Sequence, residues 1–246
     1  MERPAENIYS EGVDRMDRKD WERAKLFFQE VERQHPFSKW ARRAILMSAY
    51  ASYRAAEYDD SVSTAQRFIS LHPGNESTPY AYYLVALSYY DQIYDVGRDQ
   101  ATTVNAEAAL QQIVRRYPES DYASDAQLKL ELTHDHLAGK EMEIGRYYLR
   151  ANQQLAAIGR FKKVASDYDT TSHVEEALHR IVESYVSLGI IEEAKLVGSV
   201  LGYNHPNSEW YSDSYDLLID FGVDLDEEIA KDRKRGYWRR LRERLF

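Results

Sequence analysis

The stretch RRYPESDYASDA, Arg115–Ala126, has the composition of a helix end, a turn at Pro118 and a new helix start. Four other stretches share this form: RQHPFSKWARRA (33–44), SLHPGNESTPYA (70–81), SDYDTTSHVEEA (166–177) and GYNHPNSEWYSD (202–213). The turns are placed at Pro36, Pro73, Pro118, Asp169 and Pro206. Proline ends a helix because it lacks an N–H group and restricts the residue before it. The sequence therefore predicts five helix–turn–helix units.

The residues before each turn recur at fixed distances. Small residues stand 12 before the turn, apolar or small ones 8 before, apolar ones 5 before, and His or Tyr 1 before. In the first unit these are Ala24, Phe28, Val31 and His35. The offsets lie on one face of a helix, and the pattern is typical of the tetratricopeptide repeat (TPR) of about 34 residues. If the ring of Phe28 is fully buried, Phe28→Ala should cost about 3–5 kcal/mol of stability.

The preceding helix of each unit is expected to pack closely on this face. Small residues 24 before the turn, such as Gly12 and Gly145, would permit a close approach. The unequal turn spacings predict a loop over 95–105 and a long helix over 121–149. Polar residues after the turns are expected to cap the following helices: Ser38, Ser77, Ser120 and Thr171.

The predicted fold is an all-α, TPR-like superhelical solenoid of five repeats with a C-terminal helical extension, because such units bury their apolar faces only against neighbours. Residues 1–5 are expected to form a linker, 6–206 the repeat domain and 207–246 the extension with a basic tail.

The composition supports a helical, globular chain. Only 11 Gly and 6 Pro occur in 246 residues, which leaves little room for a turn-rich β fold. No run of 18 apolar residues and no signal-peptide pattern occurs, and the absence of Cys excludes disulfides and thiolate chemistry. Residues 231–246 carry a net charge of +6, so the rest of the chain carries −15. An acidic body argues against nucleic-acid binding.

Motifs for catalysis are absent. The sequence contains no nucleophile elbow, phosphate loop or dinucleotide fingerprint. His134 and His136 would lie about 200° apart on a helix, so they are poorly placed to share a metal ion. We therefore expect no enzyme activity, no cofactor and no metal site.

The chain resembles the BamD family of repeat-containing lipoproteins, which act in the β-barrel assembly machinery of the bacterial outer membrane. The stretches that carry the resemblance over roughly 6–203 are IYSEGVDRMDRKDWERAKLFFQEVERQHPFS (8–38), YYLVALSYYDQI (82–93), GRDQATTVNAEAALQQIVRRYPESDYASDA (97–126) and EIGRYYLRANQQLAAIGRFKKVASDYD (143–169). Two features depart from the family: its lipidated Cys is not in this sequence, and residues 202–246 extend beyond the shorter members.

The resemblance implies a non-catalytic scaffold and substrate receptor at the periplasmic face of the outer membrane, held by a lipid anchor. Its N-terminal half would bind C-terminal targeting peptides of unfolded outer-membrane proteins, with His35, Trp40, Tyr50 and Tyr53 as candidate contacts. Arg160 would face the periplasmic POTRA domains of the BamA-type barrel subunit, and other BAM lipoproteins would be further partners. Two alternatives are a TPR co-chaperone or another peptide-binding scaffold outside this machinery, and an enzyme on a helical bundle, for which no second domain is left.

The tail KDRKRGYWRRLRERLF, 231–246, combines basic residues with apolar ones at helical spacing: Trp238, Leu241 and Leu245. It is expected to dock onto a protein groove in preference to anionic lipid.

Overall fold

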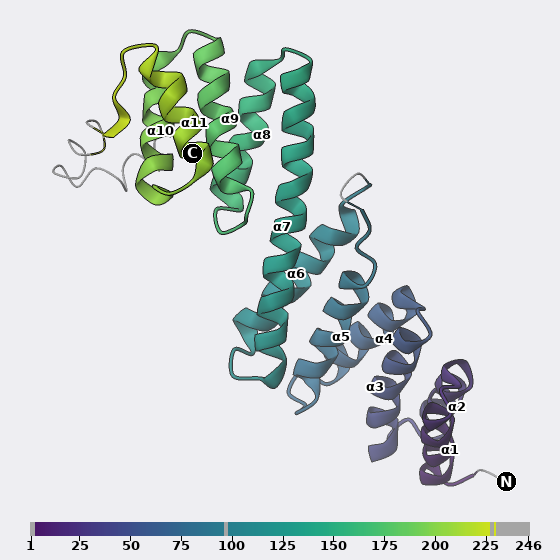
Figure 1. Cartoon of the computed structure of the whole chain (residues 1–246). Coiled ribbons are helices and arrows are strands. Elements are labelled where there is room, and N and C mark those ends of the chain that lie inside the picture. Colours follow the sequence, from purple (N-terminus) through teal and green to yellow (C-terminus); the bar gives the residue numbers. More distant parts are fainter. Residues whose placement is uncertain (1–2, 96–97, 227–228, 230–246) are drawn as a thin grey trace. The chain divides into compact units, whose positions relative to one another are not determined.

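The structure is a computed structural model that describes residues 3–95, 98–226 and 229 (Figure 1). All regular elements of this part of the chain are helices, and it contains no strand. The helices are α1 (Ala5–Asp17), α2 (Trp21–Gln34), α3 (Lys39–Arg54), α4 (Tyr58–Leu71), α5 (Thr78–Tyr90), α6 (Ala101–Arg116), α7 (Asp121–Arg150), α8 (Gln154–Asp167), α9 (Val174–Ser187), α10 (Ile191–Asn204) and α11 (Glu209–Ile219). The predicted all-α, TPR-like class is confirmed, with five consecutive helix pairs followed by α11.

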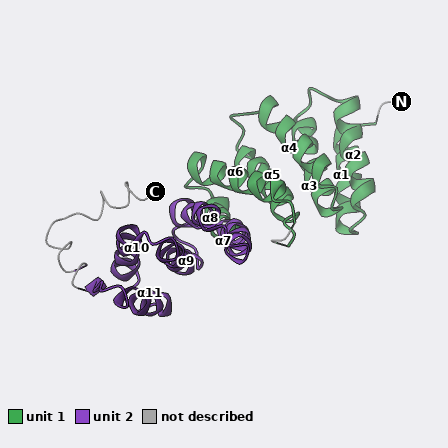
Figure 2. Cartoon of the chain, turned by 90° about the horizontal axis from the view of Figure 1, so that it is seen from above, with its two compact units in different colours: residues 1–133 green, residues 134–246 purple. Residues whose placement is uncertain are grey.

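The chain divides into two compact units, residues 1–133 and 134–246, whose boundary falls within α7 (Figure 2). Consecutive helices pack side by side in both units: α1 to α6 in the first, and α8 to α11 in the second. The assignment of residues 6–206 to one repeat domain stays a prediction.

The turns after the second helix of each pair share one backbone geometry. The His or Tyr before each turn is the C-cap, and its N–H donates to the carbonyl four residues earlier at 2.8–3.0 Å. The carbonyl of the same residue then accepts the N–H three residues later, as Tyr117 does from Ser120 at 3.0 Å. This i to i+3 bond is typical of a β-turn. The recurring Pro or Asp stretches in the sequence therefore correspond to one recurring turn.

The predicted polar caps are only partly correct. The hydroxyl of Ser38 accepts the N–H of Ala41 at 3.1 Å, as an N-cap should. Ser77 occupies the cap position of α5 without a side-chain bond. The hydroxyl groups of Ser120 and Thr171 instead donate to the carbonyl three residues earlier, at 2.8 Å in both cases. These hydroxyls therefore complete the turn, and α9 begins beyond Thr171 with His173 as its N-cap.

The residues at offsets 12, 8 and 5 are buried in all five pairs. Phe28 and Phe161 have 0% exposure, so the condition for the predicted cost of Phe28→Ala is met. Gly12 faces the ring of Phe28, and a Cβ atom there would lie 2.7 Å from a ring carbon. Gly145 faces Phe161 in the same way, with a Cβ position 2.4 Å from the ring. The predicted close approach at these glycines is confirmed.

The turns inside four of the pairs share a left-handed residue. Lys19, Ala56, Asn152 and Gly189 have φ values of 59°, 60°, 57° and 73°. All four stand 17 residues before the turn position of their pair. The third pair differs because its equivalent residue, Ala101, is already the first residue of α6.

The insertion is shorter than predicted. The irregular segment after α5 ends at Gln100, whereas the predicted loop extended to residue 105. Asp99 Oδ1 accepts the N–H of Ala101 at 3.3 Å, and Thr103, which is buried, donates to Gln100 Oε1 at 2.9 Å. These bonds extend α6 into the expected loop. The long helix predicted over 121–149 corresponds closely to α7.

The extension completes the core of the second unit. Leu218 of α11 and Leu225 after it are fully buried, and both reach the position where a Cβ on Gly198 would stand. His179 Nδ1 lies 2.9 Å from Ser214 Oγ between α9 and α11. No helix in the described part of the chain is long and apolar enough to span a membrane. The predicted docking of the basic tail concerns residues outside the described ones.

The residues with positive φ predict opposite effects on stability for two reverse substitutions, glycine to alanine and alanine to glycine. Gly189→Ala should lower the free energy of unfolding by about 1 kcal/mol, because a Cβ atom disfavours positive φ. Ala56→Gly should raise it by a smaller amount, because the relief of strain is offset by the entropy of glycine in the unfolded chain. Urea unfolding of both variants measures the two effects. A stabilising Gly189→Ala would contradict the assigned backbone conformation.

Candidate functional site

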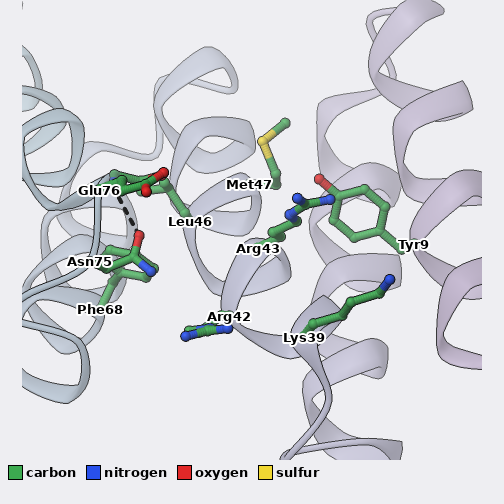
Figure 3. Close-up of a pocket in the computed structure, with 10 residues that line it drawn as sticks. Tyr9, Lys39, Arg42, Arg43, Leu46, Met47, Phe68, Asn75 and Glu76 are labelled. Atoms are coloured by element: carbon green, nitrogen blue, oxygen red, sulfur yellow. Dashed lines mark hydrogen bonds between the residues drawn. The ribbon is translucent and has the colours of Figure 1, made fainter.

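The described chain contains a hollow of about 460 Å³ in its first unit, between α3 and the α4–α5 turn (Figure 3). Its apolar lining comes from three helices and consists of Tyr9, Leu46, Met47 and Phe68. Its polar lining consists of Lys39, Arg42, Arg43, Asn75, Glu76 and Ser77. We call these ten residues the α3 pocket. Its volume suits one large side chain or a few residues of an extended peptide.

The charge of the α3 pocket is unusual for a helix start. Lys39, Arg42 and Arg43 lie within the first five residues of α3, and its first turn has no acidic residue. The N-terminal end of a helix carries partial positive charge, which favours anions and disfavours cations. None of the three forms an ion pair within the described residues, and Glu76 is the only acidic residue that lines the pocket. This arrangement costs stability by itself and favours the binding of an anionic group.

Aromatic rings border the same pocket. The rings of Tyr9 and Trp40 lie 4.9 Å apart, and Tyr9 also packs 5.3 Å from Phe28. The Lys39 ammonium and the Arg43 guanidinium lie 5.3 and 5.6 Å from the Trp40 ring. Figure 3 shows Arg43 extended toward Tyr9. Burial raises the pKa of Tyr9, and the charge of Arg43 acts against that shift. Trp40 is thus the predicted contact that the structure places beside the pocket.

The other three predicted peptide contacts lie elsewhere. His35 Nε2 is 2.7 Å from the carbonyl of Arg3, so its side chain contacts the N-terminal segment. Tyr50 and Tyr53 stand farther along α3 and pack against the cluster formed with α4 and α5. The Tyr50 hydroxyl accepts a bond from Arg54 at 2.8 Å. These residues do not line the α3 pocket, and their role in peptide binding stays a prediction.

Two tyrosines link the first helices of consecutive pairs. Tyr53 of α3 donates to Asp91 Oδ2 at the end of α5 at 2.6 Å, and Tyr83 of α5 donates to Asp125 of α7. Burial, followed by the neighbouring carboxylate, raises the pKa of both tyrosines, so each stays a neutral donor at ordinary pH. Much of the tyrosine content of these helices therefore serves packing between repeats.

Arg160 lies on α8 in the second unit, and its side chain is 41% exposed. Its Nη1 donates to Glu141 Oε2 at 3.0 Å, while Lys163 Nζ donates to Glu141 Oε1 at 2.7 Å. The Glu141 side chain is only 10% exposed. The two cations therefore neutralise a mostly buried carboxylate of α7 and still reach solvent.

This pairing determines which substitution is suited to testing Arg160. On an unpaired, exposed helix position, Arg160→Glu would leave stability nearly unchanged. In the structure it would place a second carboxylate against Glu141, and breaking a buried pair can cost several kcal/mol. Arg160→Ala tests partner binding with a smaller disturbance.

Sequence reasoning missed most of the α3 pocket. Tyr9, Arg42, Arg43 and Met47 look like ordinary members of amphipathic helices, and Phe68 like a core residue. The available signal was the cluster of three cations directly after the Ser38 cap, where acidic residues are the favoured ones.

Comparisons with known proteins give the family. A family model described as outer membrane lipoprotein matches residues 1–200. The outer membrane protein assembly factor BamD of Caulobacter vibrioides is 53% identical over 245 residues, which cover 100% of this chain and 79% of that protein. BamD of Rickettsia prowazekii is 45% identical over 218 residues, covering 89% of this chain and 87% of that protein. Among solved structures, a thermophilic TPR protein of Thermus thermophilus is 15% identical, with a TM-score of 0.41, over 88% of this chain and 100% of that one.

The Tyr53–Asp91 bond predicts a structural effect. Tyr53→Phe keeps the ring and removes the donor, so the free energy of unfolding should fall by about 1 kcal/mol. Urea unfolding measures it, with Tyr94→Phe as the control because Tyr94 is 67% exposed. If Tyr53→Phe leaves stability unchanged and weakens peptide binding, Tyr53 is a contact residue and not a link between repeats.

Proposed function

The chain belongs to the BamD family of outer membrane protein assembly factors, and we propose that within this role it is a non-catalytic substrate receptor and docking scaffold. Its relatives are named for assembly and not for a reaction. The receptor function is assigned to the α3 pocket of the first unit. The docking function is assigned to the α8 region around Arg160 in the second unit.

The observation that carries the receptor function is a cluster of cations that form no ion pair with any described residue and that share a pocket with apolar side chains. Lys39, Arg42 and Arg43 can bind a carboxylate by charge-assisted hydrogen bonds, and arginine does so in a bidentate manner. Leu46, Met47 and Phe68 line the same pocket and can contact an apolar side chain. A peptide C-terminus presents both features together, a free carboxylate and a terminal side chain. The substrate is therefore the C-terminal segment of an unfolded outer-membrane protein.

The docking function rests on the α8 cations. Arg160 and Lys163 share Glu141, and both side chains remain more than 40% exposed. A guanidinium has five donors, so Arg160 can hold Glu141 and still bind a carboxylate of a partner. The partner is a periplasmic POTRA domain of the BamA-type barrel subunit. Other lipoproteins of the assembly machinery complete the complex, and a lipid anchor on a preceding cysteine holds the protein at the periplasmic face of the outer membrane.

Peptide binding tests the receptor function. A labelled peptide that copies the last strand of an outer-membrane barrel should bind the full chain, and the same peptide with a C-terminal amide should bind about tenfold more weakly. Arg43→Ala should reduce affinity for the free-acid peptide more than for the amide. Trp40→Ala should weaken both.

Fluorescence anisotropy at fixed salt gives these affinities, because exposed charge interactions depend on ionic strength. Arg23→Ala is the matched control, since Arg23 is an exposed arginine of the same unit that does not line the pocket. Equal affinity for the free acid, the amide and a scrambled peptide would exclude recognition of a C-terminus at this site.

A second measurement tests the docking function. Arg160→Ala should weaken binding to the periplasmic domain of the barrel subunit about tenfold in a titration with the purified domain. Arg146→Ala is the control, because it also removes an arginine–glutamate pair of the second unit, with Glu176. If both variants bind equally, Arg160 is a structural residue.

A further inference from the structure

A second hollow, of about 290 Å³, lies in the second unit among α8, α9 and α10, which pack side by side (Figure 1). Its apolar lining is buried and consists of Ala165, Val174, Leu178 and Val200. Its polar lining consists of Asp169, Asn204 and His205. We call these seven residues the α10 pocket. Sites for small molecules usually measure about 300–1,000 Å³, so this smaller pocket suits one large side chain.

A comparison with the first two pairs shows why the α10 pocket is open. Ala165 stands four residues before the turn position of its pair, and Val200 stands six residues before that of the next pair. Glu32 and Arg67 stand at these places in the first and second pairs, where they form an ion pair between α2 and α4, with an N–O distance of 2.8 Å. Alanine and valine are shorter than this pair, so apolar surface is left uncovered between α8 and α10.

The last described residue brings the basic tail, 231–246, to the same helix. Ile229 packs against Gly202 of α10, where a Cβ atom would lie 2.7 Å from Ile229 Cδ1. Val200 stands two residues from Gly202 and therefore about 200° around the helix. Trp238 follows Ile229 by nine residues, which span at most about 30 Å. A helix with its side chains is about 10–12 Å wide, so the tail is long enough to pass around α10 to the pocket.

The charge of the tail is complementary to its surroundings. Residues 231–246 carry a net charge of +6. Residues 196–230, which include most of α10 and all of α11, contain eight acidic residues and no Lys or Arg. Because screening limits such attraction to about 8 Å at 0.15 M ionic strength, it favours a tail that lies directly on this part of the second unit.

We propose that Trp238 anchors the basic tail in the α10 pocket of its own chain. An indole ring buries a large apolar area, here against Ala165 and Val200, and its N–H needs an acceptor, which Asp169 or Asn204 supplies. The anchored tail covers apolar surface at the C-terminal end of the repeats, where solenoids need a polar cap. This anchor is independent of the receptor and docking functions proposed above.

A disulfide can report where the tail lies, because the chain contains no cysteine. Asn204→Cys at the pocket, combined with Arg239→Cys next to Trp238 in sequence, should form an intramolecular disulfide in the full chain under mild oxidation. Glu192→Cys with Arg239→Cys is the matched control, since Glu192 is 82% exposed near the other end of α10. Mass spectrometry should show the first disulfide forming at least about tenfold faster, because the anchor raises the local concentration of its thiols.

Two changes should remove this difference in rate. Trp238→Ala deletes the anchor and alters no residue that lines the pocket. Ala165→Glu with Val200→Arg fills the pocket with the ion pair that Glu32 and Arg67 form in the first unit, so the packing of the helices should be preserved. In both backgrounds the two disulfides should form at rates within about twofold of each other. A cooperative melting curve checks that the filled variant is folded.

Three results would overturn the anchor. If both disulfides form equally fast in the otherwise unmodified chain, the tail is not seated at the pocket, and flotation of the chain with phosphatidylglycerol vesicles would make the tail a membrane-surface element. If Trp238→Ala keeps the preference for residue 204, charge alone holds the tail and the pocket is not its seat. If the cross-linked product is a dimer, the tail occupies the pocket of a second copy.

Discussion

The packing of a phenylalanine ring against a glycine fixes the distance between the two helices in the first and fourth pairs. Phe28 occupies the space where a Cβ of Gly12 would stand, and Phe161 does the same at Gly145. Because interiors are close-packed, neither partner can change size alone. This constraint fixes the two helices and leaves their outward faces free. The α3 pocket borders the first of these contacts, because the ring of its Tyr9 packs on Phe28.

The pairing of helices followed from periodicity, because offsets of 12, 8 and 5 before each turn place residues on one face. All these positions are buried, and the predicted long helix agrees with α7 to within one residue at its end. Hydroxyl bonding was less predictable, because Ser and Thr after a turn can cap the next helix or close the turn itself. Ser38 does the first, whereas Ser120 and Thr171 do the second. The left-handed residues gave only a weak signal, since Gly189 and Asn152 are types that the conformation favours, whereas Lys19 and Ala56 are not.

The candidate functional residues were harder to predict, because their role depends on which charges are paired in the fold. A sequence lists charges but does not show which of them are neutralised. Arg160 was named from the family resemblance. Its pairing with Glu141 was not predicted, although the close packing of the two helices was. Trp40 was named from the family resemblance, and its ring lies beside the pocket. Arg42 and Arg43 beside it were missed, because charged residues on an amphipathic helix are usually only solvated.

The cations of the α3 pocket and those around Arg160 on α8 differ in whether they are paired. This difference affects what each region can bind. The cations of α3 form no ion pair with any described residue and stand at the positive end of a helix, so an arriving carboxylate removes an existing repulsion. The cations of α8 already share Glu141, so they are oriented in advance, and a second carboxylate gains less from charge. Because screening extends only over about 8 Å at 0.15 M ionic strength, the acidic remainder of the chain does not cancel either local field. Recognition at α3 can therefore depend mainly on charge, which suits many different peptide ends. Any recognition at α8 would have to depend more on shape than on charge.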